Sequence, residues 1–256
     1  MAITEVFPHP TVKQVIFQIR FPNLFYVEGK IGDFQTRIMA EFPQSKMIFP
    51  QQKVIIDRGE AGAVEYGPID KDEEARMKIW QFRSEKQVEL NVTSSSLDIN
   101  SKYHKTYKLG NADRFRDVIE FALSNFFEVT RVPIINRIGL RYIDECPVPA
   151  MDNDSFRSYY NTVLPLDRFG LDSVREMVLV AEINRGDYNI RYIEALRPTI
   201  NPKQLILDFD GYADNIQPNQ CMEVADTLHD LLLVEYEKTI REPVYEYMRR
   251  AEGDPL

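Results

Sequence analysis

The sequence predicts a mixed α+β fold made of two tandem β-α-β-β-β-α units. Segments with the two-residue alternation of strands and segments with helical spacing follow one another in the same order twice, at an offset of about 121 residues. The antiparallel sheets of the two units are expected to form one curved surface backed by the long helices. We place the units at residues 1–132 and 133–256, within one compact pseudo-symmetric domain.

The first unit opens with a strand at residues 12–21, where Val15, Phe17 and Ile19 alternate with mostly polar residues. Apolar residues then recur at helical spacing from Ile31 until Pro43, which predicts a helix. A second helix is expected from a cap at about Asn111 to Thr130. Between the two helices the strand-like segments are 47–49, 54–57, 76–83 and 88–99.

The second unit repeats this order, with a first strand at residues 134–144. Asn153 or Asp154 is expected to cap a short helix that buries Phe156, Tyr160 and Val163. Three strands follow, and a turn at residues 184–187 joins the first two as a hairpin. They span residues 175–184, 189–196 and 204–212, and the last helix spans about 220–249 with a kink expected near Pro243.

Composition restricts the classes of partner. The net charge of −9 disfavours nucleic acid and anionic membranes, although the basic residues of segment 76–86 could form a local patch. No apolar run reaches the length of a membrane span, and no secretory signal is recognisable. The two cysteines are far apart in sequence, so we expect a cytoplasmic protein without a disulfide framework.

No catalytic motif is present: the sequence has no phosphate-binding glycine loop, no nucleophile elbow and no HExxH pair. His229 has Asp226 at helical spacing but too few further ligands, so we expect a histidine on a helix surface and no metal. Cys146 and Cys221 are expected to be buried, although the start of a helix could favour a thiolate at Cys221. We therefore predict no cofactor, no metal and no catalytic residue.

Three arginines form the most suggestive set. Arg20 and Arg141 occupy equivalent places in the first strands of the two units, and Arg137 is nearby. Guanidinium groups there could clamp a phosphate, a carboxylate or an acidic segment of a partner. The alternative is that each arginine pairs with an acid of the same sheet, such as Asp144 or Asp208.

Carboxylates and one tryptophan complete the set of candidate residues. Asp208 and Asp210 point to one face of a strand, where Glu182 and Glu194 could join them as a divalent-cation patch, or where all are simply solvated. Trp80 shares a strand face with Phe82, which indicates either a core position or the lining of a groove. The ligand- or partner-binding candidates are Arg20, Arg137, Arg141, Trp80, Asp208 and Asp210.

Four segments resemble a sporadically distributed prokaryotic family of uncharacterised proteins of similar length. They are VKQVIFQIRF, WQFRSEK, NRIGLRYID and the closing DTLHDLLLVEYEKTIREPVYEYM. The resemblance covers nearly the whole chain and implies no established activity, cofactor or catalytic residue. The patchy distribution of that family implies a mobile-element or defence context.

The leading functional hypothesis is a non-catalytic protein whose curved sheet surface binds a protein partner or, second, a small-molecule ligand. One alternative is an enzyme for a phosphorylated or nucleotide substrate, in which Arg20 and Arg141 act with Asp208, Asp210 and a metal. Another is a sequence- or structure-specific nucleic-acid binder, which needs the local basic patch.

Overall fold

The computed structural model describes residues 3–49, 78–111, 113–148, 152–197 and 204–250. Nine strands form one sheet in the order β2-β3-β4-β5-β1-β6-β9-β8-β7, and every neighbouring pair is antiparallel. The strands are β1 (Val12–Arg20), β2 (Gln44–Ile48), β3 (Ile79–Arg83), β4 (Glu89–Val92), β5 (Ser96–Ser101), β6 (Ile135–Pro147), β7 (Met177–Arg185), β8 (Tyr188–Arg197) and β9 (Gln204–Ile216).

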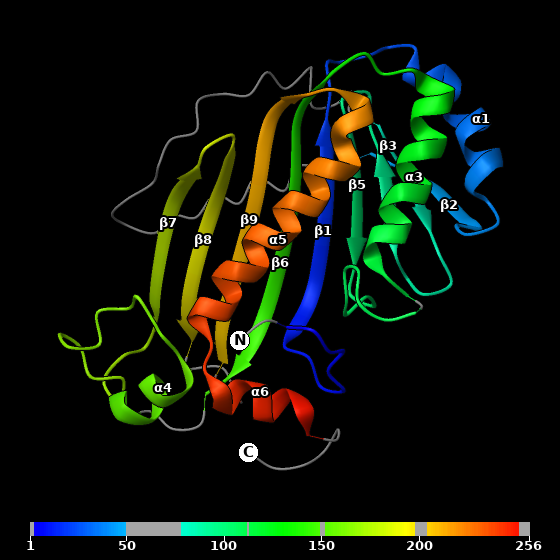
Figure 1. The fold of residues 1–256 in the computed structure, drawn as a ribbon. Coiled ribbons are helices and arrows are strands. Elements are labelled where there is room, and N and C mark those ends of the chain that lie inside the picture. The colour runs from blue at the N-terminus through cyan, green and yellow to red at the C-terminus, as the bar shows by residue number, and fades with distance from the viewer. Residues whose placement is uncertain (1–2, 50–77, 112, 149–151, 198–203, 251–256) are drawn as a thin grey trace.

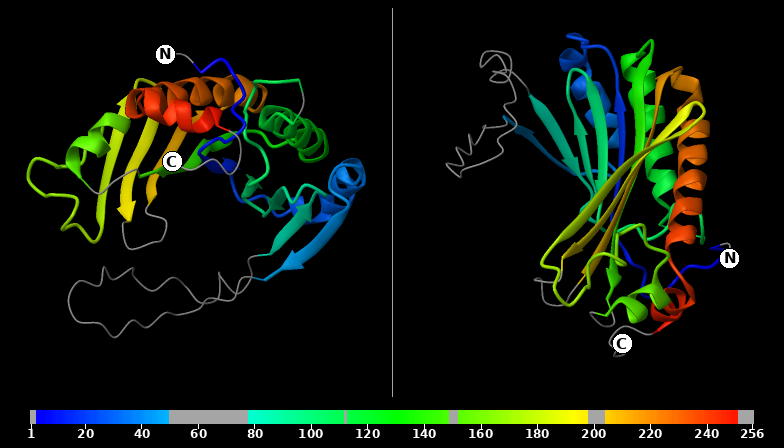
Figure 2. Two further views of the ribbon diagram at one scale, coloured as in Figure 1. Left: turned by 90° about the horizontal axis from the view of Figure 1, so that it is seen from below. Right: turned by 90° about the vertical axis from the view of Figure 1, so that its left-hand side faces the viewer.

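The three longer helices cover one face of the sheet (Figures 1 and 2). They are α1 (Val27–Ile38), α3 (Phe115–Thr130) and α5 (Cys221–Thr239), while the shorter α4 (Asn153–Tyr159) and α6 (Glu242–Arg249) lie at one end of the sheet. No helix of the described residues covers the other face, which lies on the inner side of the curved sheet in the left view of Figure 2. The expected α+β class is confirmed. None of the helices in the described part of the chain is long and apolar enough to cross a membrane.

The two halves of the chain meet at the β1–β6 pair. In this pair Gln18 lies opposite Gly139, Phe17 opposite Leu140 and Arg20 opposite Arg137. Strands of the first half continue the sheet from β1, and strands of the second half continue it from β6. Both halves therefore contribute to one continuous sheet.

The core lies between the sheet and the helices. The alternation predicted for the first strand is confirmed, because Val15, Phe17 and Ile19 face the helices and are buried. Phe34 of α1 packs with ring centroids 5.8 Å from Phe82 and 5.5 Å from a ring of α3. These edge-on aromatic contacts hold α1 and α3 against the first half of the sheet.

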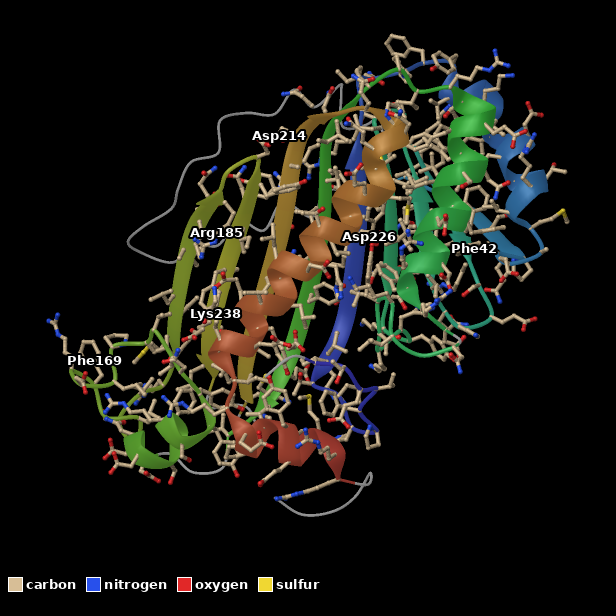
Figure 3. All side chains as sticks on the ribbon, in the orientation of Figure 1. Phe42, Phe169, Arg185, Asp214, Asp226 and Lys238 are labelled. Atoms are coloured by element: carbon tan, nitrogen blue, oxygen red, sulfur yellow. The ribbon has the colours of Figure 1, made fainter. Side chains whose placement is uncertain are left out.

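Helix α5 is fixed by a polar contact and by a close backbone approach. Asp226 of α5, labelled in Figure 3, accepts hydrogen bonds of 2.8 and 3.0 Å from Arg116 of α3 and one of 3.0 Å from Tyr107. Below the helix, a Cβ on Gly211 of β9 would lie 3.2 Å from Leu232. Glycine at this position lets the helix lie close to the sheet.

Two expected elements of the first half differ in the structure. Segment 88–99 forms β4 and β5 rather than one strand, because the hydroxyl of Thr93 accepts hydrogen bonds from the amides of Ser95 and Ser96 and closes a turn. Helix α3 begins at Phe115 without Asn111 as its cap. Carbonyl oxygens of residues 106 and 107 accept from its first two amides and replace a side-chain cap. The strand expected at 54–57 lies outside the described residues.

Two helices of the second half also differ from the expectation. Asp152 caps α4 by accepting from the amide of Ser155, and Val163 lies beyond the helix with 56% of its surface exposed. The closing helix breaks instead of kinking, because Ile240 and Arg241 are extended and Pro243 lies in the first turn of α6. Proline fits the first turn of a helix, where its missing amide is not needed, so it favours a new helix here.

Candidate functional site

Five of the six candidate residues lie on the face of the sheet that no described helix covers. Arg20 is on β1, Arg137 and Arg141 are on β6, and Asp208 and Asp210 are on the adjoining β9. Trp80 differs, since it lies on the helix side of β3 with 9% of its surface exposed and belongs to the core. The core interpretation therefore applies to this tryptophan, and it does not line the open face.

Arg141 and Asp208 form the best-defined ion pair of this face. The guanidinium donates from Nε to Oδ1 at 2.7 Å and from Nη2 to Oδ2 at 2.6 Å. Asp208 is mostly buried, with 8% of its surface exposed. Its carboxylate raises the pKa of Arg141. The alternative in which Arg141 pairs with an acid of its own sheet is therefore the one observed.

Arg137 has a looser pairing. Its Nη2 lies 3.5 Å from Asp210 Oδ2, and its guanidinium lies 3.8 Å from the ring centroid of Tyr212. Burial raises the pKa of Asp210, while the positive charges of Arg137 and Arg141 act in the opposite direction. The two aspartates are thus each paired with an arginine and do not form a free metal-binding pair.

Arg20 is exposed at the end of this row. Its Nε donates to Gln18 Oε1 at 2.6 Å, and Gln18 in turn donates to Asp98 of β5. Within the described residues Arg20 forms no ion pair, although it lies opposite the like-charged Arg137. Like charges in directly opposed positions are unfavourable, so this is where an anionic group would be best accommodated.

The predicted patch of four carboxylates is wrong for Glu194. Glu194 lies on the helix side of β8, fully buried, where it accepts from Thr162 at 2.6 Å and from Tyr192. Register places Glu194 opposite Leu207, which belongs to the core, so its side chain cannot join Asp208. The described residues contain no group of three or more His, Cys, Asp or Glu side chains suited to a metal ion.

His229 is not the expected surface histidine. Its ring stacks on Tyr107 with centroids 4.3 Å apart, and its Nδ1 is 2.9 Å from the hydroxyl of Tyr142. Burial lowers the pKa of His229 to about 4, so the ring is neutral near pH 7. Cys221 is buried as expected, and burial raises its pKa to about 12, so the thiolate alternative does not apply. Cys146 is buried as expected, and its pKa is raised as well.

The basic segment after residue 76 does not gather into a patch. Lys78 contacts Glu28, Arg83 contacts Glu89 and Lys86 contacts Asp113, so each of these cations faces an acid on a different element. Arg76 lies outside the described residues. These pairs leave little unbalanced positive charge for a phosphate backbone.

Sequence reasoning missed an apolar strip on the open face, at the edge opposite to β2. Val178 and Val180 of β7 are about half exposed, at 48% and 50%, and Val180 lies opposite Ile193 of β8. Ile206 of β9 continues the strip. The signal was the uninterrupted apolar run at residues 177–181, which we interpreted only as a strand.

Comparisons with protein-family models, with curated proteins and with solved structures return no match for this chain. Function is therefore inferred from the chain's own side chains and their arrangement.

Proposed function

We propose that this chain is a non-catalytic binding protein whose open sheet face receives an extended segment of a partner protein at strand β7. The observation that carries the proposal is the apolar edge of the sheet. Among the described strands β7 is the outermost on this side, and Val178 and Val180 project from it about half exposed. An edge strand presents unpaired backbone groups that can take an added strand.

The two edges of the sheet differ in a way that supports this assignment. The outer strand β2 carries Lys46 at its centre, the kind of charge that discourages strand addition. In β7 the run at residues 177–181 contains no charge and no proline, and Glu182 and Arg185 come only after it. Edge β7 thus lacks the usual protection over the half of the strand that carries the valines.

The neighbouring side chains suggest how a partner segment would be selected. Val178, Val180, Ile193 and Ile206 form an apolar strip beside the ion pairs of the open face. An added strand would place alternate side chains on the open face beside Val178 and Val180, and we infer that these are apolar. The arginine–aspartate row would favour charged residues on the part of the partner that extends over β9 and β6.

The test is quantitative capture of partners by the full chain and by two lysine variants. Val180→Lys places a charge on the β7 edge, at a position exposed enough to tolerate it. Val163→Lys is the matched control, since Val163 is similarly exposed but lies outside the sheet. We expect a stoichiometric protein that is captured by the wild type and by Val163→Lys and that is lost with Val180→Lys.

Two outcomes would contradict the proposal. One is a partner retained equally by Val180→Lys, which would place the contact elsewhere. The other is a chain that purifies with a nucleotide or metal and no protein, which would favour the enzyme alternative. Loss of self-association in Val180→Lys, seen by analytical ultracentrifugation, would identify the added strand as a second copy of the chain.

The opposed guanidinium groups support a second candidate, binding of a phosphorylated ligand. Arg20 and Arg137 lie opposite each other on β1 and β6, and Arg20 has no ion pair among the described residues. Titration calorimetry with inorganic pyrophosphate tests it, with Arg20→Ala expected to weaken binding about tenfold. Equal binding by wild type and variant would rule out this candidate.

The internal duplication, the family and the cellular location are also proposals. We infer an internal duplication, supported by the pairing of Gln18 with Gly139, which the repeat offset also aligns. Sequence profiles of residues 1–132 that fail to detect residues 133–256 would contradict it. We also infer membership of the sporadically distributed prokaryotic family from the four resembling segments. Two buried free cysteines favour a location in the reducing cytoplasm.

A further inference from the structure

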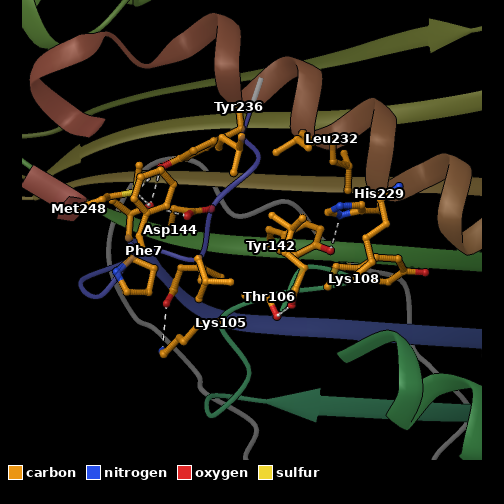
Figure 4. Close-up of a pocket in the computed structure, with 18 of the residues that line it drawn as sticks. Phe7, Lys105, Thr106, Lys108, Tyr142, Asp144, His229, Leu232, Tyr236 and Met248 are labelled. Carbon is orange, nitrogen blue, oxygen red and sulfur yellow. Dashed lines mark hydrogen bonds between the residues drawn. The ribbon is translucent and has the colours of Figure 1, made fainter. Parts of the chain in front are cut away.

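A cavity of about 150 Å³ lies on the helix side of the sheet, outside the open face (Figure 4). Helix α5, strand β6, the loop after β5 and the segment before β1 line it, and it is partly open to solvent. Its walls are mainly apolar and rich in rings; five aromatic side chains contribute, namely Phe7, Tyr107, Tyr142, Phe209 and Tyr236. A cavity of this size is comparable to an engineered one that holds benzene.

Two carboxyl groups line the cavity, and they differ: Glu5 pairs with Arg249, whereas Asp144 has no ion pair among the described residues. Asp144 of β6 has 5% of its surface exposed, and within the described residues it accepts one hydrogen bond, from the Thr11 hydroxyl to Oδ1 at 2.8 Å. The Thr11 oxygen is 2.6 Å from the hydroxyl of Tyr236. Because the single proton of Thr11 is used on Asp144, Tyr236 donates to Thr11. Oδ2 of Asp144 has no partner in the described part of the chain.

The cations near this carboxyl are engaged elsewhere. Lys105 donates to the carbonyl oxygens of Val12 and Lys102 at 3.1 and 3.2 Å, and Lys108 pairs with Asp230. Neither forms an ion pair with Asp144. His229, at the other end of the cavity, is neutral near pH 7 and contacts Tyr142. Lys13 and Lys105 act on Asp144 only through space, and within the described residues no cation is paired directly with this carboxyl.

We propose that this cavity is a binding site for a small primary amine, whose ammonium group contacts Asp144 and whose hydrocarbon body lies among the aromatic rings. A buried carboxylate is stabilised by a hydrogen-bonded cation, and the faces of aromatic rings attract an ammonium group. The cavity volume accommodates roughly six to eight non-hydrogen atoms of the ligand. This site is independent of the proposed protein-binding edge.

The state of the carboxyl gives the site a pH dependence. Burial raises the pKa of Asp144 to about 7, so the group changes charge near neutrality. An amine that needs the ionised carboxylate should bind about tenfold more tightly at pH 8 than at pH 6. The titratable and charged groups around Asp144 are Lys13, Lys105, Tyr142, Cys146, Asp208 and Tyr236.

The probe is benzylamine, compared with benzyl alcohol and benzoate, and binding to the full chain is measured by titration calorimetry. We expect the amine to bind more tightly than both controls. Asp144→Asn keeps the shape of the side chain and an oxygen for Thr11, and we expect it to weaken benzylamine binding at least tenfold and to abolish its pH dependence. Benzyl alcohol should bind the two proteins alike.

Three results would overturn the proposal: wild type that does not bind benzylamine, tighter binding of benzoate, and equal benzylamine affinity in Asp144→Asn. If the variant does not fold, amide NMR shifts of the wild type decide the question. Benzylamine should then shift the signals of Thr11, Asp144 and Tyr236, and shifts confined to other parts of the chain would count against the site.

Discussion

The burial of Asp144 predicts that the free energy of unfolding falls as the pH rises through 7. In an unfolded chain an aspartate has a pKa of about 3.9, whereas burial raises it to about 7 in the fold. The folded state therefore prefers the protonated carboxyl. The favourable contribution is complete below about pH 4 and is lost as the pH rises through 7.

The magnitude follows from the size of the shift. About three pKa units at 1.36 kcal/mol each give about 4 kcal/mol, and about 3 kcal/mol of this is lost between pH 5 and pH 8. The asparagine side chain of Asp144→Asn is uncharged at every pH, so the variant lacks this pH-dependent loss of stability. The variant should thus gain about 3 kcal/mol relative to wild type between the two pH values, whatever its absolute stability. His229, which titrates in both proteins, cancels in this comparison.

Urea unfolding of both proteins at pH 5 and pH 8 measures this double difference. Asp167→Asn is the control, because the Asp167 side chain is 92% exposed and its replacement should leave the difference unchanged. A stability difference between wild type and Asp144→Asn that is the same at both pH values would refute the reasoning. So would a difference that changes in the opposite direction.

Three further substitutions test the packing and the charge pairs. Gly211→Ala would bring a Cβ within 3.2 Å of Leu232 and push α5 from the sheet. We therefore expect the free energy of unfolding in urea to fall by about 1–3 kcal/mol. An unchanged midpoint would show that the helix can shift without cost. Arg141→Ala leaves the mostly buried Asp208 unpaired and should lower stability by about 2 kcal/mol. Arg37→Ala, which removes a surface ion pair, should cost less than about 1 kcal/mol, and equal losses would contradict the distinction.

Local pattern was sufficient for much of the secondary structure. The alternation of Val15, Phe17 and Ile19 identified β1 and its buried face, and the glycine turn at Gly186 identified the β7–β8 hairpin. The start of α3 could not be predicted from the sequence, because it is set by the loop carbonyl oxygens of residues 106 and 107, which accept from the first amides of the helix. Extended backbone at Ile240, which separates α5 from α6, was likewise not evident from Pro243 alone.

Prediction of the open face depended on strand register. Arg20, Arg137 and Arg141 could be placed on one face because their strands had readable alternation and were expected to be neighbours. Glu194 was misplaced because a shift of one residue moves a side chain to the other face. The cavity could not be foreseen, since Thr11, Asp144 and Tyr236 come from three distant parts of the chain and meet only after folding.

The central position of β1 has a consequence for the order in which the chain can assemble. Its partner β5 is available once the first half has been synthesised, but its other edge remains unpaired until β6 follows. The segment before β1 must wait longer, because the amide of His9 bonds to the carbonyl of Met248 in α6. A segment made before β1 is thus secured by one made after α5, and the cavity that they both line forms only after α6 has been synthesised.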